Sequence, residues 1–201
     1  MTKFTIISGG QTGADFAGLK AARDSGFSTA GVACRNFRTE NGYCEDFLKS
    51  FNLIDLGMSN QERTIDNIRN SDFTLIFVVD ENSPGTKLAV KELNNLGKPF
   101  LLINITPLIE ISQKSAPLLQ NARANMIDAV EYQCSSFIHG ELYFLSSIEL
   151  QKALRDPTHD GTLHDVVINI AGNRESFAPG YMEQTVYEIL MKVFSNFLEY
   201  A

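Results

Sequence analysis

Residues 4–15 read FTIISGGQTGAD, which places an apolar strand, a glycine-rich loop and the beginning of a helix in direct succession. The glycines permit positive φ and a close approach of the backbone to a ligand. Because the loop opens a helix, its N–H groups can converge on an anion at the positive end of the helix dipole. We therefore predict an anion-binding loop formed by Gly9, Gly10, Gln11, Thr12 and Gly13. The alternative is a tight turn in which Thr12 caps the helix.

The rest of the chain alternates short apolar runs with helix-like segments, which predicts a parallel sheet with crossover helices. The runs are almost continuously hydrophobic, as expected of strands buried on both faces. We expect strands at residues 4–8, 29–33, 73–79, 100–105 and 166–170, and helices at residues 14–25, 85–96 and 182–198.

The alternation stops between Thr106 and Asp165. We interpret residues 106–165 as an insertion within one domain that covers residues 1–201. One or two helices are expected in residues 107–130, a strand at residues 138–146 (IHGELYFLS) and a short helix at residues 148–154.

A second polar loop, SPGT at residues 83–86, also follows an apolar run and precedes a helix. Loops of this kind lie at the carboxyl edge of a parallel sheet, where ligands bind near a change of strand order. Gly85 and Thr86 are therefore candidates for a second phosphate contact at a helix N-terminus. A turn with a Thr cap is the alternative for this loop.

Arginines stand close to three of the loops. Arg38 follows the second run, Arg63 precedes the third with Asn67 four residues later, and Arg174 lies in the loop after the last run. A guanidinium offers a forked pair of donors to phosphate, although a surface ion pair is the alternative for each. Gly172 and Ser176 complete the candidate ligand contacts.

Two carboxylates lie among these loops. Asp15 either favours the helix dipole or accepts hydrogen bonds from a ribose or a donor-rich heterocycle. Glu175 is a candidate general base, or pairs with Arg174 or Arg63. Asp15 and Glu175 are the expected catalytic residues if the protein is an enzyme.

The overall composition limits the classes of partner. Seventeen Lys and Arg against 24 Asp and Glu give a formal net charge of −7, which speaks against a nucleic acid partner. The three cysteines and three histidines show no metal-ligand spacing, so no metal site is expected. No signal peptide or membrane-spanning segment is evident, which predicts a cytoplasmic protein without a membrane partner.

Taken in order, the motifs resemble the putative molybdenum carrier family, whose members are circularly permuted relatives of the lysine-decarboxylase-like Rossmann proteins, including the Lonely Guy phosphoribohydrolases. The resemblance rests on SGGQTGAD (8–15), RTENG (38–42), RTIDNIRNSDFTLIF (63–77), SPGT (83–86), KPFLLINI (98–105), and NIAGNRES with APG (169–180). Asn173 departs from the Gly-Pro-Arg-Glu-Ser that the family usually carries there, and the long stretch at 106–165 is a second departure.

The resemblance implies an α/β protein with a three-layer Rossmann-like fold, in which helices flank a mostly parallel β-sheet. It also implies a bound phosphorylated ligand, suggested to be molybdenum cofactor, and a homo-oligomer, either a dimer or a tetramer.

Two functions follow from these observations. The first is a carrier or storage protein for molybdenum cofactor or a similar pterin phosphate, in which an unpaired acid, Asp15 or Glu175, binds the heterocycle. The alternative is a nucleotide-binding sensor or a nucleoside-monophosphate N-ribohydrolase. A third interpretation is a degenerate module whose insertion recruits a protein partner through apolar residues of the segment 137–145.

Overall fold

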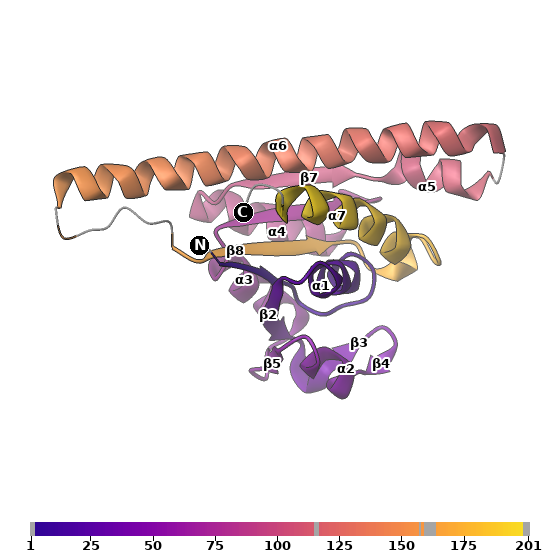
Figure 1. The fold of residues 1–201 in the computed structure, drawn as a ribbon. Helices are drawn as coiled ribbons and strands as arrows, with labels where there is room; N and C mark the ends of the chain where they lie inside the picture. The colour runs from indigo at the N-terminus through magenta and orange to yellow at the C-terminus, as the bar shows by residue number, and fades with distance from the viewer. Residues whose placement is uncertain (1–2, 115–116, 157, 159–163, 199–201) are drawn as a thin grey trace.

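The computed structural model describes residues 3–114, 117–156, 158 and 164–198. Its main feature is a six-stranded sheet in the order β5-β2-β1-β8-β6-β7, in which every neighbouring pair is parallel (Figure 1). The strands are β1 (Phe4–Ile7), β2 (Ser28–Ala33), β5 (Leu53–Asp55), β6 (Phe73–Val78), β7 (Phe100–Asn104) and β8 (Val166–Gly172).

Helices cover both faces of this sheet. In Figure 1, α1 (Ala14–Asp24) and α7 (Met182–Leu198) lie in front of the sheet, and α3 (Asn60–Arg69) and α4 (Pro84–Leu96) lie behind it. The front helices share the largest core cluster, whereas Ile68 of α3 and Leu93 of α4 pack on Ile76 in a separate cluster. The three-layer Rossmann-like fold with a parallel sheet is therefore confirmed.

The chain between β7 and β8 forms two helices, α5 (Thr106–Gln113) and α6 (Pro117–Arg155). The 39-residue α6 runs along one side of the molecule, next to β7, α5 and α7 (Figure 1). None of the helices in the described ranges has both the length and the apolar character needed to span a lipid bilayer.

Smaller elements lie at the β5 side of the sheet. A 3-10 helix η1 (Arg35–Phe37) leads into the antiparallel hairpin β3 (Arg38–Thr39) and β4 (Gly42–Tyr43), and α2 (Glu45–Lys49) follows. Another 3-10 helix, η2 (Glu175–Phe177), precedes α7.

The five strands and three helices expected from the sequence are confirmed to within one or two residues. The sequence missed β5 and the β3-β4 hairpin, since three- and two-residue strands are too short to show a hydrophobic run.

The strand expected at residues 138–146 is wrong, and the separate short helix at residues 148–154 is wrong in its extent, because both segments belong to α6. Cys134 and Ile138 are fully buried, and Leu142 and Leu145 pack against the same cluster. This spacing of three to four residues is that of one helix face, and it outweighs the β propensity of Tyr143 and its aromatic neighbour.

Candidate functional site

A cavity of about 240 Å³ lies where β1, β6 and β8 end, between these strands and the helices α3 and α4. This volume is somewhat below the roughly 300–1,000 Å³ of most small-molecule sites, so it suits a compact ligand group. Nine of the residues predicted from sequence line the cavity, namely Gly9, Gln11, Asp15, Arg63, Asn67, Gly85, Thr86, Gly172 and Arg174.

Backbone geometry explains the glycines of the first loop. Gly10 and Gly13 have φ of 67° and 79°, which residues with a side chain rarely adopt. A Cβ atom on Gly9 would lie 1.3 Å from Nη1 of Arg63. Glycine at position 9 therefore lets the Arg63 guanidinium lie directly against the loop.

Two of the loop's N–H groups bond within the protein instead of pointing to a free anion site. The N–H of Gln11 donates to Oδ2 of Asp15 at 3.1 Å, and the N–H of Thr12 donates to Oε1 of Gln11 at 3.3 Å. Thr12 does not cap α1, because Gly13 occupies the N-cap position and provides no side chain.

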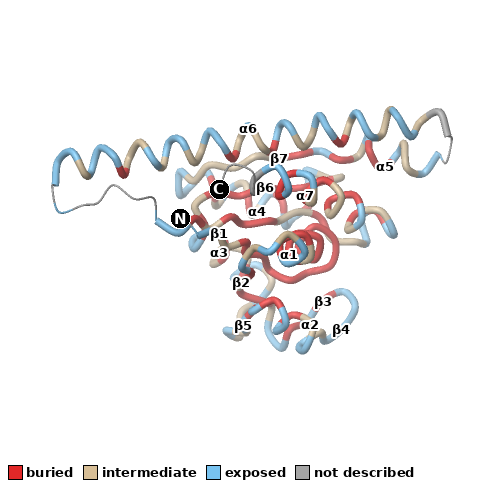
Figure 2. Tube along the Cα trace, in the orientation of Figure 1, coloured by how far each residue is buried: buried red, intermediate tan, exposed pale blue. Residues whose placement is uncertain are grey.

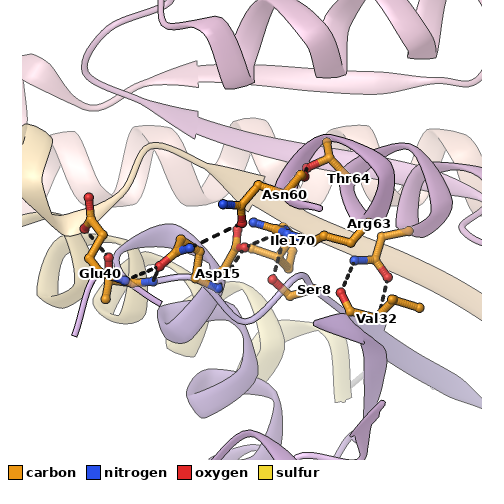
Figure 3. A network of polar contacts seen from close by, with 11 residues as sticks. Ser8, Asp15, Val32, Glu40, Asn60, Arg63, Thr64 and Ile170 are labelled. Atoms are coloured by element: carbon orange, nitrogen blue, oxygen red, sulfur yellow. Dashed lines mark hydrogen bonds and ion pairs between the residues drawn. The ribbon is translucent and has the colours of Figure 1, made fainter. Parts of the chain in front are cut away.

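Asp15 forms a buried ion pair with Arg63, from α1 to α3 (Figure 3). Nη1 of Arg63 donates to Oδ2 of Asp15 at 3.0 Å, and the two residues are only 9% and 4% exposed. Burial raises the pKa of Asp15 above its usual value, and the nearby Arg63 offsets part of this effect. The interpretation of Asp15 as an unpaired acid is therefore wrong.

Arg63 keeps one unused donor. Its Nε is the only buried side-chain nitrogen or oxygen in the described part of the chain that has no hydrogen-bond partner. Because a buried polar group without a partner is costly, this donor leaves an unmet hydrogen bond in the wall of the cavity.

Glu40 lies in the hairpin turn, and its carboxylate interacts with three donor residues that we predicted from the sequence to contact a ligand. Its carboxylate accepts hydrogen bonds from the hydroxyls of Thr12 and Ser176, and Nη1 of Arg174 lies 3.9 Å away. Partial burial would raise the pKa of Glu40, but the hydrogen bonds from Ser176 and Thr12 lower it overall. Sequence reasoning quoted RTENG but missed this role, since nothing local indicates where the hairpin folds.

Figure 3 shows this network reaching from Glu40 through Asp15 to the α3 residues Asn60 and Arg63. Gln11 links its two halves. Its Oε1 accepts the N–H of Glu40 at 2.8 Å, while its Nε2 lies 3.5 Å from Oδ1 of Asn60.

The start of α4 forms the opposite wall of the cavity. The Ser83 hydroxyl caps this helix by accepting the N–H of Thr86 at 3.3 Å. Nδ2 of Asn173 donates to that hydroxyl at 3.1 Å, and its Oδ1 accepts the N–H groups of Val79 and Asp80 at 2.8 Å. Asn173, the departure from the family's usual loop, thus ties the loop after β8 to the loop after β6.

The remaining predicted residues lie outside the cavity lining. Gly10 and Gly13 face Leu48 and the Asn173 backbone respectively, and Arg38 is exposed on the hairpin. Glu175 pairs with neither Arg174 nor Arg63. It accepts the N–H groups of Gly180 and Glu183 at 2.6 and 2.7 Å at the start of α7.

Asn67 has an evident structural contact. Its Oδ1 accepts the N–H of Val32 at 2.9 Å, and its Nδ2 donates to the Val32 carbonyl at 3.1 Å. This pair of bonds fixes α3 against β2, beside the cavity that Asn67 lines. Among the described residues, no group of three or more His, Cys, Asp or Glu side chains could hold a metal ion.

The fold and the cavity define a Rossmann-like α/β protein with a polar crevice at the carboxyl edge of its sheet. The chain belongs to the circularly permutated YpsA SLOG family, whose model matches residues 6–131.

A solved structure shares this fold. It is a protein from Syntrophus aciditrophicus SB named "Putative molybdenum carrier protein", which is 24% identical and superimposes with a TM-score of 0.67. The similarity covers 96% of this chain and 95% of that one. A comparison with curated proteins finds no match.

Proposed function

We propose that this protein binds a phosphorylated small molecule in the crevice and carries or stores it without turning it over. The observation that carries the proposal is the unpartnered Nε of Arg63, a 91% buried residue that lines the cavity beside the α4 N-terminus. A helix N-terminus attracts anions, and a charged donor close to it strengthens that attraction.

The charges around the cavity favour an anion, even though the chain is acidic overall. Arg63 and Arg174 line it together with one acid, Asp15. Asp15 already accepts two hydrogen bonds from the protein, so it does not have to be satisfied by a ligand. A phosphate near Arg174 would replace the more distant Glu40 carboxylate as the partner of this guanidinium.

Molybdenum cofactor is the ligand that we propose. The resemblance of the loops and the name of the protein from Syntrophus aciditrophicus support it. A pterin phosphate would place its phosphate against Arg63, Arg174 and the start of α4, and the compact cavity would leave the heterocycle near the mouth. The three free cysteines fit residence in a reducing compartment such as the cytoplasm.

The test is to denature freshly purified protein and identify the released molecule by mass spectrometry, with a parallel molybdenum determination. We expect a stoichiometric phosphorylated pterin in the wild type and a strongly reduced amount in Arg174→Ala. Arg38→Ala is the matched control, because Arg38 is exposed and lies outside the cavity lining. Equal ligand content in wild type and Arg174→Ala would contradict the proposed site.

The second candidate function is that of a nucleotide-binding sensor or a nucleoside-monophosphate N-ribohydrolase. One observation favours it: the Asp15 carboxyl lies buried in the cavity wall with a raised pKa, as expected of a general acid or base. Glu175 lines no part of this cavity, so Asp15 would have to act without it. Incubation with a panel of nucleoside monophosphates should release free base in the wild type and not in Asp15→Asn. No release across the panel rejects the hydrolase.

A further inference from the structure

The long helix α6 is apolar on two opposite sides. One side packs on the body of the protein through Ile127, Cys134 and Ile138, all at most 5% exposed. The other side carries residues that we call the outer stripe: Ala129, Tyr132, Ser136, Gly140, Tyr143, Ser147, Leu150 and Leu154. At 3.6 residues per turn these eight positions fall within about 80° around the helix, opposite the buried side.

The outer stripe faces away from the sheet. Figure 2 shows exposed segments recurring along the side of α6 that is turned away from the other elements. Tyr132, Tyr143 and Leu154 are 73%, 79% and 78% exposed. The stripe contains no Asp, Glu, Lys or Arg, although the chain as a whole carries a net charge of −7.

Gly140 lies in the middle of this stripe. A glycine inside a helix costs about 1 kcal/mol relative to alanine. Nothing in the described structure lies within 4 Å of a Cβ atom at this position, so no contact with a described residue requires glycine there. Close approach of a second helix does require a small residue.

The pattern is that of a helix pair. Ala129, Ser136, Tyr143 and Leu150 recur every seven residues, which is the spacing of left-handed supercoiled helices. Four positions of the stripe carry small residues and four carry large ones, so large side chains of one stripe can pack against small residues of an identical stripe. The Ser147 hydroxyl donates to the Phe144 carbonyl at 2.7 Å, so it needs no partner across an interface.

The exposed aromatic area supplies a large part of what a stable contact needs. Aromatic side chains contribute about 150–250 Å² each, so Tyr132, Tyr143 and the adjacent Phe144, which is 59% exposed, together expose roughly 300–500 Å² per copy. Two copies would therefore bury roughly 600–1,000 Å² from these residues alone. Leu150 and Leu154, which are 59% and 78% exposed, add to this area, and specific interfaces bury about 1,200–2,000 Å² in total.

We propose that the outer stripe binds the outer stripe of a second copy of this chain, forming a twofold dimer through α6. A twofold axis brings the same surface of both subunits together, so the stripe has to be complementary to itself. An uncharged stripe also lets two acidic chains meet without facing like charges.

The experiment is light scattering after size exclusion of the full chain over a range of micromolar concentrations. We expect the wild type at twice the chain mass of 22.3 kDa, or at four times that mass if a second interface exists. Tyr143→Glu should raise the dissociation constant of the α6 contact at least about 100-fold, because the substitution enters a symmetric interface twice. Tyr43→Glu is the matched control, since Tyr43 is 73% exposed but lies on β4.

A second variant separates association from folding. Gly140→Gln improves helix propensity while it blocks close approach, so it should weaken the dimer without lowering the helix content measured by circular dichroism. A wild type that stays monomeric at every concentration, or a dimer that survives both Tyr143→Glu and Gly140→Gln, overturns the proposal.

Discussion

Arg63 and Asp15 are 48 residues apart in sequence, yet Nη1 of one lies 3.0 Å from Oδ2 of the other inside the wall of the cavity. The contact depends on Gly9, because any side chain at this position would occupy the space of the guanidinium. The ion pair therefore links the glycine loop, α1 and α3 into one unit, and it leaves Nε of Arg63 without a hydrogen-bond partner.

Replacing Arg63 should destabilise the protein substantially. In Arg63→Gln the Asp15 carboxylate stays buried without its cation, and loss of one partner of a buried pair costs about 3–5 kcal/mol. Arg69→Gln is the control, since Arg69 pairs with Glu92 while 60% exposed and should lose less than about 1 kcal/mol. Urea denaturation measures both, and equal losses would contradict the buried pair.

The pH dependence of stability should carry a contribution from Asp15. Its pKa is raised in the folded state, so the folded protein holds this proton more tightly than the unfolded chain does. The contribution is present below the unfolded value of about 3.9 and is lost as the pH rises through the folded pKa. Asp15→Asn lacks it.

The measurement is the free energy of unfolding of both proteins at a series of pH values. The series begins at about pH 4, which is close to the pKa of aspartate in an unfolded chain. Wild type should lose stability relative to Asp15→Asn as the pH rises. A wild type that instead gains relative stability would mean that the attraction to Arg63 outweighs burial.

Gly13→Ala should be far more damaging than Gly26→Ala. Both glycines have φ near +80°, so each alanine suffers about 1–2 kcal/mol of backbone strain. A Cβ on Gly13 would also lie 2.6 Å from the Asn173 carbonyl oxygen, whereas nothing lies within 4 Å at Gly26. We expect about 3 kcal/mol or more for Gly13→Ala. The measurement is thermal unfolding. Similar melting temperatures for the two variants would show that the loop after β8 shifts to accommodate the added methyl group at little cost.

Cys134 should be inert to thiol reagents in the folded protein. It is fully buried, and burial raises the pKa of its thiol to about 12. At pH 8 roughly one thiol in 10,000 is then ionised, and only the thiolate reacts. Titration with a chromogenic disulfide should not detect the Cys134 thiol in the folded wild type. After denaturation it should count one more thiol in the wild type than in Cys134→Ala. Rapid reaction of Cys134 under native conditions would contradict the packing of α6.

Much of the fold follows from local sequence. The strands at residues 73–79 and 100–105 are uninterrupted apolar runs, and Gly97 ends α4 in the left-handed conformation that glycine favours. The glycine loop at residues 8–15 was predictable for the same reason. Backbone conformation at glycines and burial of continuous apolar runs depend mainly on neighbouring residues.

The sequence predicted many residues of the candidate site, but not which of them interact with each other. Nine predicted residues line one cavity, because the carboxyl ends of parallel strands meet at one edge. No local pattern indicated that the Glu40 carboxylate accepts the hydrogen bonds of the Thr12 and Ser176 hydroxyls. The contact with Ser176 depends on where a short hairpin lies against a loop 136 residues away.

For this protein, the sequence by itself determined the parallel α/β architecture and the position of the polar loops, since hydrophobic periodicity and glycine placement act over a few residues. Only the tertiary structure decided that Asp15 is paired with Arg63 and that residues 138–146 continue α6. Both outcomes depend on burial against distant parts of the chain, and burial sets the strength of an ion pair and selects helix over strand.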